Sequence, residues 1–176
     1  MKKTLLTLAI AVAPLNVSAE EVKESYDGHR IGAGYANTVF VDNNNNGHYY
    51  GNGIKLEYGY DINRVVGLNA SYSINDGFER DVDWKGRTFA LSTDLGYAMD
   101  FGSWNLKPYG VVGLANYDES WTNSRSSGSY NNMALQVGFG ARFQWNQGLY
   151  IDLRSVGMAD EYDAIGQVTV TAGYRF

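Results

Sequence analysis

The sequence predicts an all-β fold, an eight-stranded antiparallel transmembrane up-and-down β-barrel. Three observations predict it. Apolar and polar side chains alternate along most of the chain, the connections between the alternating segments are short and long in turn, and aromatic residues recur at the end of every second segment. A β-strand points successive side chains to opposite faces, so this alternation gives each strand one apolar and one polar face.

Composition excludes several classes of protein. A length of 176 residues allows one domain, and the net charge of −5 argues against nucleic acid as a partner. The chain has no cysteine, which excludes a disulfide, a thiolate metal site and a thiol nucleophile. Its 21 glycines and 14 tyrosines, with only 2 prolines, are unusual for a soluble domain, and a membrane barrel accounts for them.

The N-terminus has the three parts of a secretory signal peptide. Residues 1–3 are Met-Lys-Lys, residues 4–15 are apolar, and residues 17–19, Val-Ser-Ala, form a small-residue cleavage site. A short membrane anchor is the alternative, but a spanning helix needs about 20 apolar residues. We therefore expect a cleaved signal at 1–19, followed by a β-barrel domain at 20–176 that is exported to the cell outer membrane.

Eight alternating segments follow the signal. Between Leu135 and Trp145, for example, every second residue is apolar and the residues between them are polar or glycine. The pattern is looser in 31–41, and it does not assign the two faces of 107–117. The predicted strands are 31–41, 54–60, 66–74, 89–99, 107–117, 135–145, 149–153 and 168–176. An even number of strands is typical of bacterial outer-membrane barrels, and about ten residues is the spanning length of a tilted strand.

The connections between these strands alternate in length. The short ones are 60–65, 99–106 and 145–149, and the long polar ones are 42–52, 75–85, 118–131 and 157–166. Short turns at one end and long loops at the other are typical of outer-membrane barrels, with the long loops outside the cell.

Charged residues on the polar faces distinguish a membrane barrel from two soluble rivals. In a β-sandwich these charges would be solvated, and in a lipocalin-like barrel the apolar face would line the interior. In a membrane barrel they must point into the lumen, because an Arg or Lys facing lipid at the midplane costs about 2–4 kcal/mol. The predicted lumen charges are Lys55, Glu57, Asp94, Arg142, Asp152, Arg154 and Arg175.

Aromatic residues mark the end of each strand that runs toward the short turns. Tyr and Trp collect at membrane interfaces, where one end of the ring is wet and the other apolar. The chain closes on Tyr174 and Phe176, an alternation that resembles the signal read by the outer-membrane assembly machinery. The alternative is that these residues are simply the end of the last strand of a β-protein.

Three motifs resemble the Ail/OmpX family. They are Gly53-Ile-Lys-Leu-Glu-Tyr-Gly-Tyr60 followed by Val65-Val-Gly-Leu68, Pro108-Tyr-Gly-Val-Val-Gly113, and the closing Ala172-Gly-Tyr-Arg-Phe176. The resemblance covers nearly the whole chain after the signal, although other small outer-membrane barrels share the closing pattern. It implies an eight-stranded barrel with a filled polar interior, and some members mediate adhesion, host-cell invasion or serum resistance through their loops.

Two other function classes remain as alternatives. A lipid-modifying enzyme of the lipid A deacylase type would use a His-x-Ser pair, and neither His29 nor His48 has one. No phosphate loop, serine elbow or metal-ligand cluster appears, so we expect no catalytic residue, cofactor or metal. A narrow channel for ions or small solutes is the second alternative, but the interior of an eight-stranded barrel is only wide enough for side chains to fill.

The long loops are where binding is expected, because loops carry function on rigid scaffolds. An acidic excess there disfavours heparin-like polyanions and permits basic host proteins, or divalent cations bridged to lipopolysaccharide phosphates. The alternative is that these acidic residues only keep the cell-surface loops soluble. The other expected partners are outer-membrane lipid, periplasmic chaperones and the assembly machinery. The surface-loop candidates are Asp76, Glu79, Asp81, Asp83, Asp118, Glu119, Trp121, Asp160, Glu161 and Asp163.

The sequence therefore predicts an integral outer-membrane barrel that presents acidic loops outside the cell. Adhesion, interaction with a host and integrity of the envelope are the candidate roles of these loops.

Overall fold

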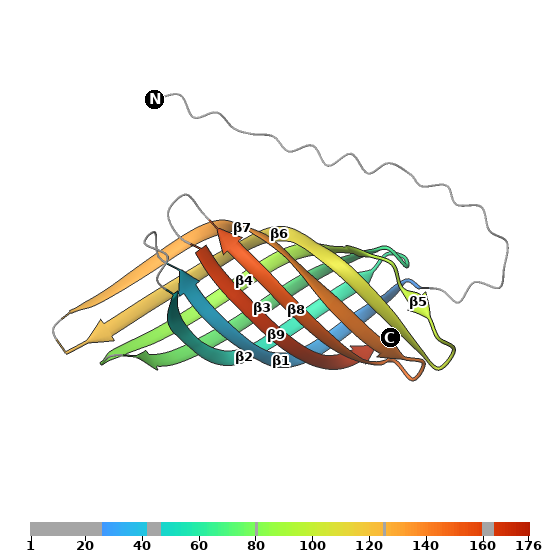
Figure 1. The fold of residues 1–176 in the computed structure, drawn as a ribbon, viewed down its shortest axis with the longest axis horizontal. Helices are drawn as coiled ribbons and strands as arrows, with labels where there is room; N and C mark the ends of the chain where they lie inside the picture. The colour runs from blue at the N-terminus through green and yellow to red at the C-terminus, as the bar shows by residue number, and fades with distance from the viewer. Residues whose placement is uncertain (1–25, 42–46, 80, 125, 160–163) are drawn as a thin grey trace, which may run out of the picture.

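The computed structural model describes residues 26–41, 47–79, 81–124, 126–159 and 164–176, and all of its regular structure is β-strand. The strands form one closed wall around a long axis (Figure 1). Their bounds are β1 (Gly28–Val41), β2 (Gly47–Asp61), β3 (Val66–Glu79), β4 (Val82–Gly96), β5 (Met99–Asp100), β6 (Trp104–Asn123), β7 (Ser127–Trp145), β8 (Leu149–Ala159) and β9 (Ala164–Arg175).

Each long strand pairs with its two neighbours in antiparallel register. The barrel closes because β1 pairs with β9 as well as with β2, and because β4 pairs directly with β6. The two-residue β5 pairs only with Leu106 and Asn105, inside the connection between β4 and β6. The prediction of a closed, antiparallel eight-stranded barrel is therefore confirmed, with β5 as a small addition within a turn.

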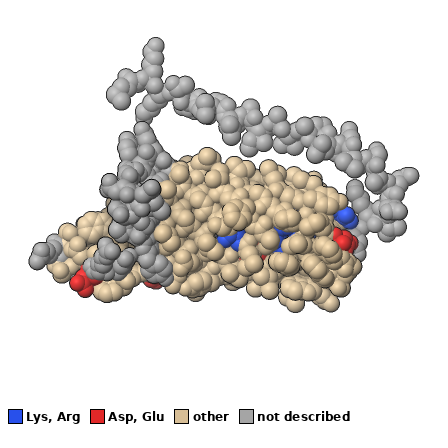
Figure 2. Space-filling view, in the orientation of Figure 1, with Lys and Arg blue, Asp and Glu red and all other residues tan. Residues whose placement is uncertain are grey.

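The side chains inside the wall are mostly polar or charged and those outside are mostly apolar, which is the reverse of a soluble protein. Along β8, the side chains of Asp152 and Arg154 are buried in the interior, whereas Leu153 between them is 45% exposed on the outer face. Phe139 on β7 is 69% exposed. On the face that it draws, Figure 2 shows a broad area of uncharged residues along the barrel, with only small charged spots within it. Such a band matches the apolar girdle that a membrane barrel presents to lipid.

The structure also assigns the strand whose faces the sequence left open. On β6, Lys107, Tyr109, Val111 and Ala115 are buried inside the barrel, and Leu114 is exposed outside. The pattern was ambiguous because three of these four inward residues are apolar, so both faces of the strand are largely apolar.

Among the described residues there is no helix long and apolar enough to cross a membrane.

The two longest hairpins correct the predicted loops. β4 stays paired with β6 as far as Val82 opposite Asn123, and β6 with β7 as far as Thr122 opposite Ser127, whereas β8 joins β7 only at Ala159 opposite Leu135. The hairpins β3–β4 and β6–β7 therefore run out beyond the ends of β8 and β9 (Figure 1). We call this four-stranded extension the projecting sheet, formed by 77–79, 82–86, 118–123 and 127–134.

Most of the surface-loop candidates accordingly lie in strands rather than loops. These segments lack apolar alternation, but the backbone pairing of the barrel wall continues through them regardless of side-chain polarity. Asp81 alone lies in a tight turn, with a positive φ of 64°. Three candidates, Asp160, Glu161 and Asp163, fall outside the described residues. The candidates found in strands are Asp76, Glu79, Asp83, Asp118, Glu119 and Trp121.

The outward position of Phe139 gives a direct test of the lipid-facing band. Phe139→Arg is expected to destabilise the barrel by about 2–4 kcal/mol, because it places a charge in hydrocarbon. Phe139→Leu keeps an apolar side chain there and serves as the control. Folding into liposomes, followed by heat-modifiable gel mobility, should rank the Arg variant below the Leu variant. Equal folding of the two variants would mean that Phe139 does not face lipid.

Candidate functional site: barrel interior and projecting sheet

Arg142 is the centre of a buried ion network that crosses the lumen. Its Nη2 donates to Asp94 at 2.6 Å, its Nε donates to Asp152 at 3.0 Å, and its Nη1 lies 3.3 Å from Asp61. These carboxylates come from β4, β8 and β2, so one guanidinium on β7 ties four strands together across the interior. The pairs lie almost wholly out of contact with solvent.

A second centre lies at Glu57, whose carboxylate is fully buried. Lys55 Nζ donates to Glu57 Oε2 at 2.8 Å, Arg154 Nη2 lies 3.2 Å from the same oxygen, and Arg30 Nη1 lies 3.6 Å from Oε1. Arg30 also donates from Nε to Asp61 at 2.8 Å, which joins this centre to that of Arg142.

Tyr109 links the two centres from β6. Its hydroxyl donates to the Asp152 carboxylate, whose two oxygens lie 2.6 and 2.7 Å away. The same hydroxyl accepts a hydrogen bond from Arg154 Nε at 3.1 Å. Buried charges are tolerated only when they are paired and hydrogen-bonded. In the described lumen five cations form ion pairs with four carboxylates, and the members of this ion network are Arg30, Lys55, Lys107, Arg142, Arg154, Glu57, Asp61, Asp94 and Asp152.

Six of the seven predicted lumen charges lie within this network. They are Lys55, Glu57, Asp94, Arg142, Asp152 and Arg154. The seventh, Arg175, is half-buried at the periplasmic mouth, where its Nη2 donates to the carbonyl of Asp27 at 3.2 Å.

Sequence reasoning missed four interior groups: Arg30, Asp61, Lys107 and Tyr109. Asp61 was placed in a turn, although it lies six residues after Lys55 and four after Glu57, at an even spacing that puts all three on the same face of the strand. That parity was the available signal. Lys107 and Tyr109 lie on the strand whose faces the pattern did not separate.

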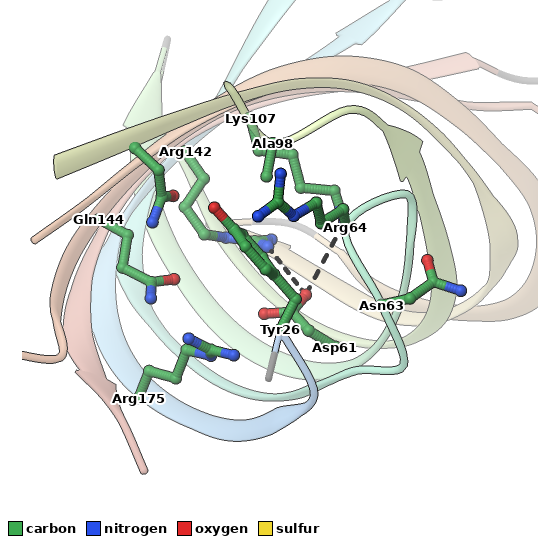
Figure 3. A pocket seen from close by; sticks show the side chains of 10 residues that line it. Tyr26, Asp61, Asn63, Arg64, Ala98, Lys107, Arg142, Gln144 and Arg175 are labelled. Atoms are coloured by element: carbon green, nitrogen blue, oxygen red, sulfur yellow. Dashed lines mark hydrogen bonds and ion pairs between the residues drawn. The ribbon is translucent and has the colours of Figure 1, made fainter. Parts of the chain in front are cut away.

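The periplasmic mouth is closed by side chains rather than open. Figure 3 shows Tyr26 lying across it between Arg64 and Arg175, with the Arg64 guanidinium 4.2 Å from the centroid of the Tyr26 ring. A side-chain hydrogen bond with Tyr97 raises the pKa of Arg64 above its ordinary value, so this guanidinium remains charged. Behind these residues the hollow measures only about 10 Å³, which is near the smallest space that holds one water molecule.

Toward the extracellular end the interior changes from charged to neutral and then to apolar. Asn75 Nδ2 donates to the Thr38 hydroxyl at 2.8 Å, and Gln167 Nε2 donates to the same oxygen at 3.2 Å. Beyond them a buried apolar layer crosses the lumen, formed by Ala90, Ala115, Tyr117, Ala134, Met158 and Ile165. The described interior is therefore filled by ion pairs at one end and by this apolar layer at the other.

The side chain of His29 contacts aromatic residues rather than a nucleophile. At the start of the first strand, His29 Nδ1 lies 2.6 Å from the Tyr58 hydroxyl, and its ring stacks with those of Tyr58 and Phe176 and is tilted against that of Tyr60. His48 was predicted in a loop, but the backbone places it at the start of β2. Within the described ranges no group of three or more His, Cys, Asp or Glu could hold a metal ion.

The closing residues lie on the outer surface at the periplasmic end. Tyr174 is 49% and Phe176 is 67% exposed. The backbone amide of Phe176 donates to the carbonyl of His29, and the amide of His29 donates to the carbonyl of Phe176, both at 2.9 Å. These two bonds hold the C-terminus to the first strand.

The projecting sheet carries aromatic residues on the face that continues the lumen. Trp84 on β4 lies opposite Trp121 on β6, which in turn lies opposite Gly128 on β7. A Cβ at Gly128 would lie 2.8 Å from the Trp121 ring, so the close packing of this indole requires glycine there. Glu119, a predicted surface residue, is only 9% exposed on the same face.

The outer face of this region is charged. The acidic side chains that are exposed are Asp76, Asp81, Asp83 and Asp118, and the basic ones are Lys85 and Arg87.

Comparison with known families identifies the barrel. The sequence matches the family described as "Outer membrane protein beta-barrel domain" over residues 4–176. The chain belongs to this family. The family match and the structural match to Ail both support a place in the outer membrane and the resemblance to Ail/OmpX-type barrels.

Solved structures show the same fold. The chain is 22% identical to Ail, the attachment invasion locus protein of Yersinia pestis, over 85% of this chain and 99% of that one, with a TM-score of 0.65. It is 17% identical to Neisserial surface protein A, over 84% and 97% of the two chains, with a TM-score of 0.68. A further structure of Yersinia pestis Ail, solved in complex with the heparin analogue sucrose octasulfate, matches at 20% identity, over 85% and 99% of the chains, with a TM-score of 0.65. A comparison with curated protein sequences found no match.

The ion network predicts a large cost for removing its central cation. Arg142→Leu leaves Asp94, Asp152 and Asp61 without their shared guanidinium, and breaking a buried pair from one side costs about 3–5 kcal/mol. The control is Arg64→Leu in the turn after β2, which removes a cation–π contact with Tyr26 that is worth about 0.5–1 kcal/mol at such a site. Urea unfolding of the barrel in lipid should show a much lower midpoint for the Arg142 variant alone. An unchanged midpoint would show that the network does not stabilise the fold.

Proposed function

We propose that this barrel is a membrane anchor for a surface binding element, and that the projecting sheet is that element. The proposed role is adhesion to, or interaction with, a protein outside the cell. The observation that carries the proposal is the outer edge of β7 between Ser127 and Ala134. This segment pairs with β6 on one side, and no described strand pairs with it on the other.

An open strand edge is a binding template. It presents a row of backbone N–H and C=O groups that can pair with an extended segment of another chain. Natural proteins usually protect such edges with Lys, Pro or a bulge. The edge from 127 to 134 reads Ser-Gly-Ser-Tyr-Asn-Asn-Met-Ala and contains no charged residue and no proline. Its composition therefore leaves pairing possible.

The charge around the edge favours a neutral or basic partner. On the outer face of the neighbouring strands the carboxylates Asp76, Asp83 and Asp118 outnumber the cations Lys85 and Arg87. Ail of Yersinia pestis was solved with a heparin analogue. The acidic excess argues against carrying that polyanionic ligand over to this chain.

The interior supports the two alternatives less well. A channel for ions would have to pass the ion network, the apolar layer and the closed periplasmic mouth, and an eight-stranded barrel leaves no room beside its side chains. A lipid-modifying enzyme would need a nucleophile and a base in contact, and His29 instead bonds to Tyr58 among aromatic rings. Binding at the surface remains the function that the geometry supports best.

The proposal also includes the export and assembly of the barrel. Residues 1–19 act as a cleaved export signal, and Tyr174 and Phe176 are read by the assembly machinery before the barrel closes. Integrity of the envelope is a second candidate role, favoured by the ion pairs and the apolar layer that occupy the described interior.

Blocking the edge tests the proposed binding element. Ser129→Lys with Asn131→Lys adds two charges to the edge of β7 and should abolish binding of protein-displaying cells to plates coated with host matrix proteins. Ser120→Lys with Thr122→Lys adds the same charges to the same face of β6, which is paired on both sides, and should leave binding intact. Equal behaviour of the two double variants, with both barrels folded, would exclude the edge as the binding element.

Conductance tests the channel alternative. Pure protein in a planar bilayer is expected to give no steady conductance, because the ion network and the apolar layer both block the lumen. Reproducible unit conductance that disappears with Met158→Trp, which enlarges a side chain of the apolar layer, would show an open path and would favour the channel.

A further inference from the structure

The ion network of the lumen has one cation in excess. Five basic side chains share four carboxylates there. Glu119 is the one other buried carboxylate among the described residues, and it lies beyond the apolar layer, on the extracellular side of Tyr117. Buried charges are stable only when they are paired, so the excess positive charge requires one more anion.

Lys107 on β6 is the cation with the weakest pairing. Its Nζ donates to Asp94 at 3.4 Å and lies 3.8 Å from Asp61. Arginines hold the same two carboxylates more closely, since Arg142 lies 2.6 Å from Asp94 and Arg30 lies 2.8 Å from Asp61. An ammonium group has three donors, and these long contacts use them poorly. Lys107 is only 4% exposed, so bulk water does not compensate for the missing partner.

The small hollow at the periplasmic mouth lies directly beside Lys107 (Figure 3). Its lining includes a single carboxylate, that of Asp61, and four cationic side chains, those of Arg64, Lys107, Arg142 and Arg175. Such a concentration of positive charge in a narrow space attracts an anion and excludes a cation.

Uncharged donors line the same hollow. Asn105 on β6 and Gln144 on β7 lie opposite each other in the register, one step toward the periplasm from the opposed pair of Lys107 and Arg142. Gln144 is 8% exposed, and its side-chain amide forms no hydrogen bond with any other residue that the structure describes. A buried amide without a partner is costly, so a ligand in the hollow that accepts from this group stabilises the fold.

We propose that the hollow binds one chloride ion, in contact with Lys107 Nζ and the side-chain amide of Gln144. The ammonium group and the amide N–H groups donate to the ion, and hydrogen bonds of this charge-assisted kind are strong. Arg64 and Arg175 at the rim add positive potential. The ion supplies the negative charge that the network lacks. This inference does not depend on the proposed binding edge of β7.

The size of the hollow selects a monatomic anion. Its volume of about 10 Å³ is near the smallest space for one water molecule, so phosphate, sulfate or a carboxylate group does not fit behind the Tyr26 ring. Chloride is only slightly larger than water, and the flexible ends of Lys107 and Arg64 can move by the small amount that it requires. Water alone would satisfy the Gln144 amide but would leave the excess charge unpaired.

Urea unfolding of the barrel in detergent micelles tests the site, with sodium chloride replaced stepwise by sodium gluconate at constant ionic strength. An ion that binds only the folded state raises the folding equilibrium constant about tenfold for each tenfold rise in its concentration above Kd, and the native barrel should show this dependence. Lys107→Met removes the excess cation and should abolish it. Gln144→Leu changes no charge and should shift it to higher chloride. Lys85→Met is the control, because it removes an exposed cation from the outer face of β4 and should keep the native dependence.

Bromide gives a second readout that needs no variant. Crystals of the native barrel soaked in sodium bromide should show an anomalous peak in contact with Lys107 Nζ, behind the Tyr26 ring. Three results would overturn the proposal: equal stability of the native barrel in chloride and gluconate, a chloride dependence that Lys107→Met retains, and a soaked crystal without bromide in the hollow. Heat-modifiable mobility shows whether each variant is folded, and the bromide result decides if Lys107→Met is not.

Discussion

The need to pair every backbone polar group within hydrocarbon is the constraint on which the rest of this structure depends. A sheet with an open edge in lipid would leave N–H and C=O groups unbonded, at a cost of several kcal/mol each. The chain meets this requirement by closing β1 onto β9 and β4 onto β6. Closure then fixes the polarity of the side chains, because alternate residues of every strand must face either lipid or the lumen.

A closed wall of eight strands also determines what the interior can do. The space is only wide enough for side chains, and polar side chains placed there must find their partners among themselves. Glycines make this possible at crowded points. A Cβ at Gly59 would lie 2.6 Å from the Arg30 guanidinium, and one at Gly140 would lie 2.5 Å from Tyr109. Because the described lumen is occupied in this way, binding of another protein is left to the outer face and to the projecting sheet.

Much of this architecture could be predicted from the sequence, because it depends on period-two polarity. Leu149–Leu153 and Leu135–Trp145 show one apolar and one polar face, and the structure places those faces outside and inside. The pattern did not assign β6, where inward Val111 and Ala115 remove the contrast between the faces.

The ends of the strands were harder to predict than their centres. Above the membrane no lipid selects apolar side chains, so the strands of the projecting sheet lack the alternation that marks a strand. Asp118 and Glu119 therefore resembled loop residues, although backbone pairing with β4 and β7 continues through them.

Adjacent single cysteines test the central claim, the inverted polarity of the wall, most directly, because the native chain has no cysteine. Val168 is 55% exposed on the outer face of β9, and its neighbour Thr169 is 1% exposed in the lumen. In proteoliposomes, a fluorophore on Val168→Cys should be quenched strongly by spin-labelled lipid. Thr169→Cys should stay unreactive toward maleimide until the barrel is unfolded. Ready labelling of both cysteines by a water-soluble maleimide, with no quenching by lipid at 168, would contradict the claim that residue 168 faces lipid and residue 169 faces the lumen.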